Sequence, residues 1–284
     1  MKLKPRLLVL AGLLWASVNG ACQDTNFFVF LCFGQSNMEG FPGIEEQDKG
    51  PVDDRFQVLA AVDFPKLGRT KGNWYPATPP LCRPSAGLGP ADYFGRTLVS
   101  NLPPHVRVGV VNVSIGGCKI ELFEKDTFQS YVTTAPNWMT NIIATYGGNP
   151  YQHLVEMARR AQKDGVIKGI LLHQGESNTN DREWPNKVLG VYTHLLQDLN
   201  LQAEHVPLLA GELVGADQKG ACASMNRIIG ELPKTIPTAH VIGSAGCAGR
   251  PDRLHFTPAG YRELGKRYAE KMLAVMGVSA AAAK

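Results

Sequence analysis

The apolar run FFVFLCF at residues 27–33 is followed at once by the polar segment GQSNMEG at residues 34–40. A short apolar run that is rich in aromatic side chains and ends at a glycine is typical of a strand buried on both faces. Such strands occur in parallel sheets that are covered by helices on both sides. The polar turn then marks the carboxyl end of the strand, the edge at which these sheets carry their sites.

Four further apolar runs repeat this pattern, and we expect buried strands at 107–113, 167–173, 208–213 and 240–243. Amphipathic helical patterns cover residues 151–161, 188–199 and 258–275, the last with Thr257 as a capping residue and Pro258 in its first turn. The alternation predicts a five-stranded parallel sheet between two helix layers, a three-layer α/β/α sandwich. The proline-rich segment 40–90 is expected to be a loop-rich insertion that packs through its aromatic residues.

The N-terminus has the layout of a secretory signal peptide. Lys2, Lys4 and Arg6 precede an apolar run over residues 7–18, and small residues follow up to Ala21. We therefore predict a leader over 1–21, a single mature domain over 22–278 and a disordered tail over 279–284. The protein would be secreted, periplasmic or held at the cell surface. A lipid anchor at Cys22 stays open, as does the pairing of the six cysteines.

The formal charge of +4 comes from 29 basic and 25 acidic residues, and three of the basic ones lie in the predicted leader. The remaining surface is nearly neutral, which gives no electrostatic case for nucleic acid or an anionic membrane as a partner. With 44% hydrophobic and 19% charged residues, the chain is not disordered, collagen-like or a coiled coil. Outside the leader we expect no membrane span.

Candidate chemistry begins at Ser36, which lies in the turn after the first strand between Gly34 and Gly40. A serine in a tight turn at a strand end can present its hydroxyl at the sheet edge. Near the C-terminus, Asp252 precedes His255 by three residues. At this spacing the carboxylate can accept from Nδ1 of the imidazole and leave Nε2 free for a serine. The pattern indicates a Ser-His-Asp hydrolase.

Two more polar blocks follow core strands. The first is SIGGC at 114–118, whose paired glycines allow backbone N–H groups to approach a substrate oxygen. The second is HQGESN at 173–178, in which Gln174 offers an amide donor and Glu176 an acid. We interpret His173 as a core histidine. The sequence shows no cluster of His, Cys, Asp or Glu with metal-ligand spacing, so we expect neither a metal nor a cofactor.

Taken together, GQSNMEG, the GG pair, HQGESN and DRLH at 252–255 resemble the SGNH hydrolase superfamily in order and spacing. More narrowly, they resemble its carbohydrate-esterase branch, the acetylxylan esterases of carbohydrate esterase family six and the sialate O-acetylesterase domains. The resemblance runs from about residue 27 to about residue 276 and includes CRPSAGLGPAD at 82–92. It implies a flavodoxin-like SGNH fold.

The resemblance also implies roles for individual residues. Ser36 matches the nucleophile, His255 the general base and Asp252 the acid that orients it. The oxyanion donors would be the backbone N–H groups of Ser36 and Gly117 and the side chain of Gln174. Most SGNH enzymes carry Gly-x-Asn-Asp at the third block, where this chain has Gln174 and Glu176. Glu176 is therefore a second candidate for the acid that supports His255.

The expected function is a secreted serine esterase that removes acetyl groups from a plant polysaccharide such as acetylxylan. Aromatic faces suit sugar rings, and Trp74, Trp138 and Trp184 all follow predicted core strands, so we expect at least one of them at the site. A sialate O-acetylesterase is the nearest alternative. A noncatalytic carbohydrate-binding protein of the same fold is the alternative from a different class.

Overall fold

A seven-stranded sheet runs through the computed structural model, which describes residues 23–41 and 43–278. Its strand order is β3-β2-β4-β1-β5-β6-β7, and every neighbouring pair is parallel except β2 with β3. The strands are β1 (Asp24–Gly34), β2 (Phe56–Leu59), β3 (Trp74–Pro76), β4 (Arg107–Ser114), β5 (Gly165–His173), β6 (Leu208–Gly211) and β7 (Ala239–Ile242).

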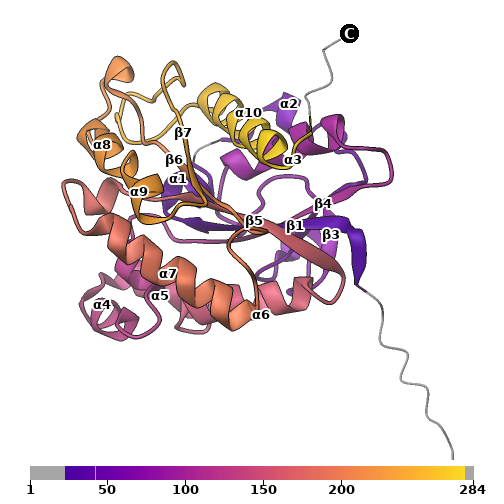
Figure 1. The fold of residues 1–284 in the computed structure, drawn as a ribbon, viewed down its shortest axis with the longest axis horizontal. Helices are drawn as coiled ribbons and strands as arrows, with labels where there is room; N and C mark the ends of the chain where they lie inside the picture. Colours follow the sequence, from indigo (N-terminus) through magenta and orange to yellow (C-terminus); the bar gives the residue numbers. More distant parts are fainter. Residues whose placement is uncertain (1–22, 42, 279–284) are drawn as a thin grey trace, which may run out of the picture.

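Two helix layers cover the sheet (Figure 1). Along β1, Val29, Leu31 and Phe33 face α6 (Pro150–Ala161) and α7 (Trp184–Leu199) within one core cluster. Phe30 and Cys32 point the other way, into the cluster that holds α3 (Pro90–Asn101) and α10 (Pro258–Val275). Successive strand residues alternate between the faces, so an apolar run without gaps fills both cores. The predicted three-layer α/β architecture is confirmed.

The predicted number of five strands is wrong, because the proline-rich segment contributes β2 and β3. In β2 the side chains of Phe56, Val58 and Leu59 are buried. The strand has only four residues, and β3 has three and returns antiparallel to it. Strands this short give a weak pattern in the sequence. The five expected strands are all present, with ends that differ by a few residues.

Short elements make up most of the remaining structure. The helices are α1 (Ser36–Glu39), α2 (Glu46–Lys49), α4 (Phe128–Thr134), α5 (Asn137–Thr145), α8 (Asn226–Ile229) and α9 (Leu232–Thr235), with 3-10 turns at Pro65–Leu67, Ile120–Phe123, Glu176–Asn178, Ala216–Gln218 and Ala223–Met225. Thr257 caps α10 as predicted, because its Oγ1 accepts from the N–H of Gly260 at 3.1 Å.

The predicted leader over 1–21, Cys22 and the tail over 279–284 lie outside the described residues. The cysteines of the described ranges are free thiols, and four of the five are buried. Over these same ranges, the helices lack the combination of length and apolar character that crossing a membrane requires.

Candidate functional site

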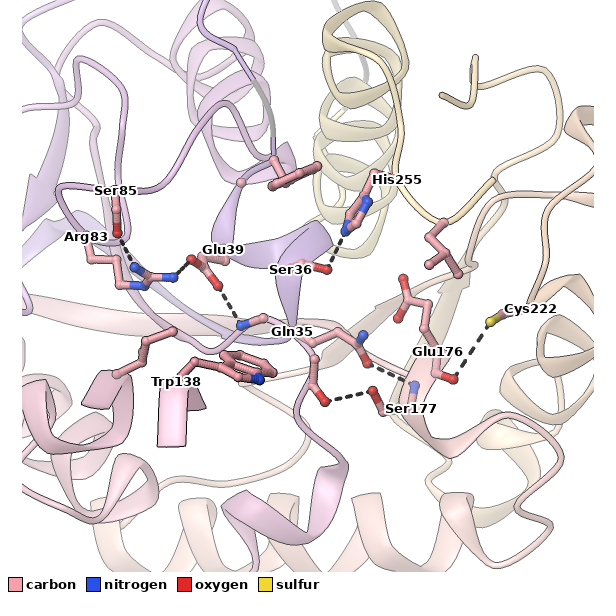
Figure 2. A pocket seen from close by; sticks show the side chains of 16 residues that line it. Gln35, Ser36, Glu39, Arg83, Ser85, Trp138, Glu176, Ser177, Cys222 and His255 are labelled. Carbon is pink, nitrogen blue, oxygen red and sulfur yellow. Dashed lines mark hydrogen bonds and ion pairs between the residues drawn. The ribbon is translucent and has the colours of Figure 1, made fainter. Parts of the chain in front are cut away.

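The polar blocks predicted from the sequence meet at the carboxyl edge of the sheet. Strands β1, β4 and β5 lie side by side and end in register, with Gly34 beside both Ser114 and His173. The residues that follow these strands line a pocket of about 510 Å³, a volume within the usual range for small-molecule sites. The loop before α10 closes the pocket from the other side and carries His255 (Figure 2).

Ser36 is positioned by the close contact between β1 and β5. Gly34 has a φ of 147°, and a Cβ at this position would lie 2.1 Å from the carbonyl oxygen of His173. The N–H of Gln35 donates to that same oxygen at 3.0 Å. Only a glycine permits this approach, and the chain then turns directly into α1, whose first residue is Ser36.

Ser36, His255 and Asp252 form a connected chain of hydrogen bonds. The Oγ of Ser36 lies 2.8 Å from Nε2 of His255, and Nδ1 of His255 lies 3.0 Å from Oδ2 of Asp252. The other carboxylate oxygen of Asp252 accepts from the N–H groups of Leu254 at 2.9 Å and His255 at 3.0 Å. This local turn explains how a spacing of three residues brings the carboxylate to the imidazole.

The same turn keeps Asp252 ionised. Partial burial raises its pKa, but the N–H groups of His255 and Leu254 and the imidazole of His255 together outweigh that effect, so the pKa lies below its ordinary value. Asp252 is therefore a carboxylate that can stabilise a positive charge on His255.

Glu176 lies in the pocket wall but has a different partner. Its carboxylate accepts from the side-chain amide of Asn37, and its other oxygen has no partner within the described residues. Burial raises the pKa of Glu176 to about 7, and the bond from Asn37 only partly offsets this. Asn37 also donates to the carbonyl oxygen of Leu254 at 3.0 Å. Glu176 is thus connected to the loop of His255 through Asn37 and not to the imidazole itself.

Of the three expected oxyanion donors, the structure brings two to the pocket. Ser36 and Gly117 both line it, and across residues 23–41 and 43–278 their N–H groups have no internal acceptor. Gly117 has a φ of 71°, in the left-handed region that favours glycine. Gln174 lies beneath the pocket instead, and its amide nitrogen donates to Oδ1 of Asn178 at 2.7 Å and to Oε1 of Gln35 at 3.1 Å.

A family model described as "Carbohydrate esterase, sialic acid-specific acetylesterase" matches residues 26–274. The match spans all the strands of the sheet except the first residues of β1, together with every block of the pocket. The chain belongs to this family. The family consists of carbohydrate acetylesterases, so the protein is a hydrolase that acts on sugar esters.

Solved structures agree with this membership at the level of the fold. A protein from Arabidopsis thaliana is 20% identical with a TM-score of 0.67, and the alignment covers 87% of this chain and 98% of that one. The protein NanS is 18% identical with a TM-score of 0.66, covering 88% and 98%. A carbohydrate acetylesterase from Xanthomonas citri is 18% identical with a TM-score of 0.61, covering 87% and 56%.

Of the three candidate tryptophans, at least one of which is expected at the site, Trp138 is the one that lines the pocket of this esterase. Trp138 is 52% exposed and packs beside Gly117. Trp184 is fully buried, and its indole N–H donates to Oε1 of Gln174. Trp74 begins β3 beside Leu59, but its side chain turns back toward the amino edge of the sheet, where it packs on Phe27 and its indole N–H donates to Asp164 at 2.8 Å.

Phe41 also lines the pocket of this acetylesterase, although it lies in none of the motifs that pointed to the site. Phe41 follows the GQSNMEG block, is 43% exposed and packs against the ring of His255, with 4.2 Å between the ring centroids. Its position directly after the serine turn is the sequence signal that could have placed it at the site. Its contact with His255 joins segments far apart in the sequence.

The pocket also contains an ion pair that the sequence analysis missed. Glu39 accepts from the guanidinium of Arg83 and, at 2.6 Å, from the N–H of Gly116 (Figure 2). Burial raises the pKa of Glu39, and Arg83 and the N–H of Gly116 offset only part of that effect. Glu39 lies in GQSNMEG and Arg83 in CRPSAGLGPAD, so both residues belong to sequence motifs of the site. The sequence alone does not show that the two side chains pair. Glu39 thus ties α1 both to the segment of Arg83 and, through the N–H of Gly116, to the turn that carries Gly117.

Proposed function

We propose that this family member is a serine O-acetylesterase in which Ser36 is the nucleophile, His255 the general base and Asp252 the orienting acid. The observation that carries the proposal is the distance of 2.8 Å between Oγ of Ser36 and Nε2 of His255 at the wall of the pocket. A nucleophile within hydrogen-bond reach of a base that a third group orients is the arrangement required for acyl transfer.

In the first step, Oγ of Ser36 attacks the carbonyl carbon of an acetyl ester while Nε2 of His255 takes the hydroxyl proton. The carbonyl electron pair moves onto oxygen, and the N–H groups of Ser36 and Gly117 donate to the resulting oxyanion. Asp252 stabilises the imidazolium through Nδ1. The tetrahedral intermediate then collapses, and His255 gives its proton to the departing sugar hydroxyl.

In the second step, His255 takes a proton from a water molecule, which attacks the acetyl-enzyme. Collapse of the second intermediate releases acetate and returns the proton to Ser36. The same oxyanion donors serve both steps, because the new negative charge forms on the same carbonyl oxygen. Both steps therefore use the side chains of Ser36, His255 and Asp252.

The charge of the pocket favours a neutral sugar such as acetylxylan. Among the described residues that line the pocket, Arg83 is the one arginine or lysine. Its guanidinium already pairs with Glu39. A sugar carboxylate would have to compete with Glu39 for this cation. The exposed rings of Trp138 and Phe41 instead offer apolar faces on which a sugar ring can stack.

The alternative substrate is an O-acetylated sialic acid, which the description of the family model favours. Acetate release from acetylated xylan and from O-acetyl sialic acid, each with and without a chelator, separates the two. We expect the higher kcat/KM on acetylated xylan and no effect of the chelator. A preference for the sialic acid would overturn the neutral-sugar assignment, and sugar binding without acetate release would favour a noncatalytic binding protein.

We further propose that residues 1–21 direct export and that a single domain follows over 22–278. The basic start, apolar run and small residues of the N-terminus support this proposal. The N-terminal sequence and mass of the protein recovered from the medium or the cell envelope test it. Cleavage before Cys22 with an added lipid mass would indicate the lipid anchor, and a retained leader would contradict export.

A further inference from the structure

The side-chain amide of Gln35 has an orientation that its neighbours determine. Its Oε1 accepts from the amide nitrogen of Gln174 at 3.1 Å and from the N–H of Gly175 at 3.2 Å. Because a backbone N–H can only donate, it is the oxygen of Gln35 that faces β5, and the NH₂ group faces away from it. The sequence places this amide directly before Ser36.

The NH₂ group of Gln35 is therefore turned toward the pocket. Gln35 lines the pocket beside Ser36, although only 3% of the residue is exposed. Figure 2 shows its amide between Ser36 and Ser177, with the oxygen bonded on the Ser177 side. Within the described ranges, Nε2 has no protein acceptor, so both of its hydrogens are available to a ligand.

Gln174 does not offer such a donor. The indole N–H of Trp184 can only donate, so it holds Oε1 of Gln174 toward itself. The amide nitrogen is then directed to Oδ1 of Asn178, Oε1 of Gln35 and the carbonyl oxygen of Cys118, so protein acceptors already surround both of its hydrogens. Gln174 is 1% exposed and does not line the pocket. Its role is to hold the oxygen of Gln35 in place.

We propose that Gln35 is a catalytic residue that donates Nε2–H to the oxyanion, in place of the side chain of Gln174. This inference rests on the proposed serine mechanism. As the Oγ–C bond forms and the carbonyl electron pair moves onto oxygen, the amide of Gln35 joins the N–H groups of Ser36 and Gly117 in stabilising the charge. Gln174 and Gly175 hold the amide in this orientation before the substrate arrives.

Two substitutions separate the donor of Gln35 from its acceptor. Gln35→Glu keeps an oxygen for Gln174 and Gly175 but removes the NH₂ group, whereas Gln35→Met removes both. If Gln35 donates to the oxyanion, Gln35→Glu lowers kcat on an aryl acetate by about a hundredfold, and at least as much as Gln35→Met. KM should change by less than about threefold, because the donor acts mainly in the transition state.

A boronic acid that forms a tetrahedral adduct with Ser36 provides a second readout. Its inhibition constant should rise in Gln35→Glu by a factor similar to the fall in kcat, with an unchanged midpoint of thermal unfolding. Gln162→Glu is the matched control, since the amide of Gln162 donates to the carbonyl oxygen of Leu199 away from the pocket. We expect this control to keep the kcat of the unmodified enzyme.

A kcat of Gln35→Glu or Gln35→Met within about threefold of the unmodified enzyme would overturn the inference. Greater damage from Gln35→Met than from Gln35→Glu would also overturn it, because that order means that Gln35 acts only as an acceptor. A failure of the proposed serine mechanism would give a different result: Ser36→Ala would still hydrolyse the aryl acetate.

Discussion

The Nδ1 atom of His255 lies 3.0 Å from a carboxylate oxygen of Asp252, while the carboxylate of Glu176 bonds to the side chain of Asn37. Of these two acids, Asp252 is the one that contacts the imidazole. Asp252 has a lowered pKa and Glu176 a raised one, because hydrogen bonds dominate at the first and burial at the second. This difference assigns the two acids separate tasks.

We predict that Asp252→Asn lowers kcat far more than Glu176→Gln. The loss of the carboxylate at Asp252 leaves His255 without the partner that selects its tautomer, which costs roughly 10³- to 10⁴-fold in related triads. Glu176→Gln keeps an oxygen that can accept from Asn37, so we expect a loss below about tenfold. Steady-state kinetics on an aryl acetate measure both. The opposite order would make Glu176 the acid of the triad.

Glu176 should make the stability of the fold depend on pH. The pKa of Glu176 is raised from 4.5 to about 7, so the folded protein keeps a proton that the unfolded chain has already lost in this range. The contribution of Glu176 is therefore most favourable below pH 4.5 and is lost as the pH rises to about 7. The shift corresponds to at most about 3 kcal/mol.

Glu176→Gln removes this titration and should stabilise the protein at alkaline pH. We expect the free energy of unfolding in urea to rise by about 1 to 3 kcal/mol relative to the unmodified protein at pH 8.5. The gain should be much smaller at pH 4.5, where Glu176 is protonated in the folded state and about half protonated in the unfolded chain. An equal difference between the two proteins at both pH values would show that Glu176 is not held neutral by burial.

Gly117 should be essential for turnover on every ester. With a φ of 71° and a Cβ position 2.9 Å from the ring of Trp138, Gly117→Ala both strains the backbone and displaces the indole. We predict a loss of about a hundredfold in kcat, the usual effect of one misplaced oxyanion donor. Gly148→Ala is the control, since Gly148 has a φ of 83° in open space. Equal losses in both variants would mean that strain alone is responsible.

Trp138 should affect the binding of sugar substrates and not the chemistry. Trp138→Ala removes an exposed ring from the pocket, and we predict that KM for acetylated xylan rises roughly three- to tenfold. The kcat on a small aryl acetate should stay within twofold. Trp74→Phe is a matched change at an aromatic residue outside the pocket and should leave both constants unchanged. An unaltered KM in Trp138→Ala would exclude Trp138 from sugar binding.

The sequence predicts the parts of this fold that long or local patterns specify. The apolar run of β1 and the cap at Thr257 are confirmed, since each depends on adjacent residues. Likewise the contact between Asp252 and His255 spans only three residues. The strands β2 and β3 could not be predicted, because the short run of β2 becomes a strand only beside β4 and that of β3 only beside β2.

The sequence does not predict how side chains at the site are oriented. Gln35 and Gln174 are the same residue type, and each follows a buried strand. Which of the two turns its NH₂ group toward the pocket depends on the indole of Trp184 and the N–H of Gly175. In the same way, Trp74 begins a strand beside Leu59, but its side chain points toward the opposite edge of the sheet, where its partners are Phe27 and Asp164.

We propose that Ser36 carries the acetyl group between the two steps, and acetate release by Ser36→Ala measures this role without depending on the other residues. The substitution removes one oxygen and should leave the midpoint of thermal unfolding close to that of the unmodified protein. We predict that Ser36→Ala releases acetate from acetylated xylan and from an aryl acetate at less than about one-thousandth of the unmodified rate. A folded Ser36→Ala protein that hydrolyses either ester at a rate near that of the unmodified enzyme would mean that Ser36 is not the nucleophile.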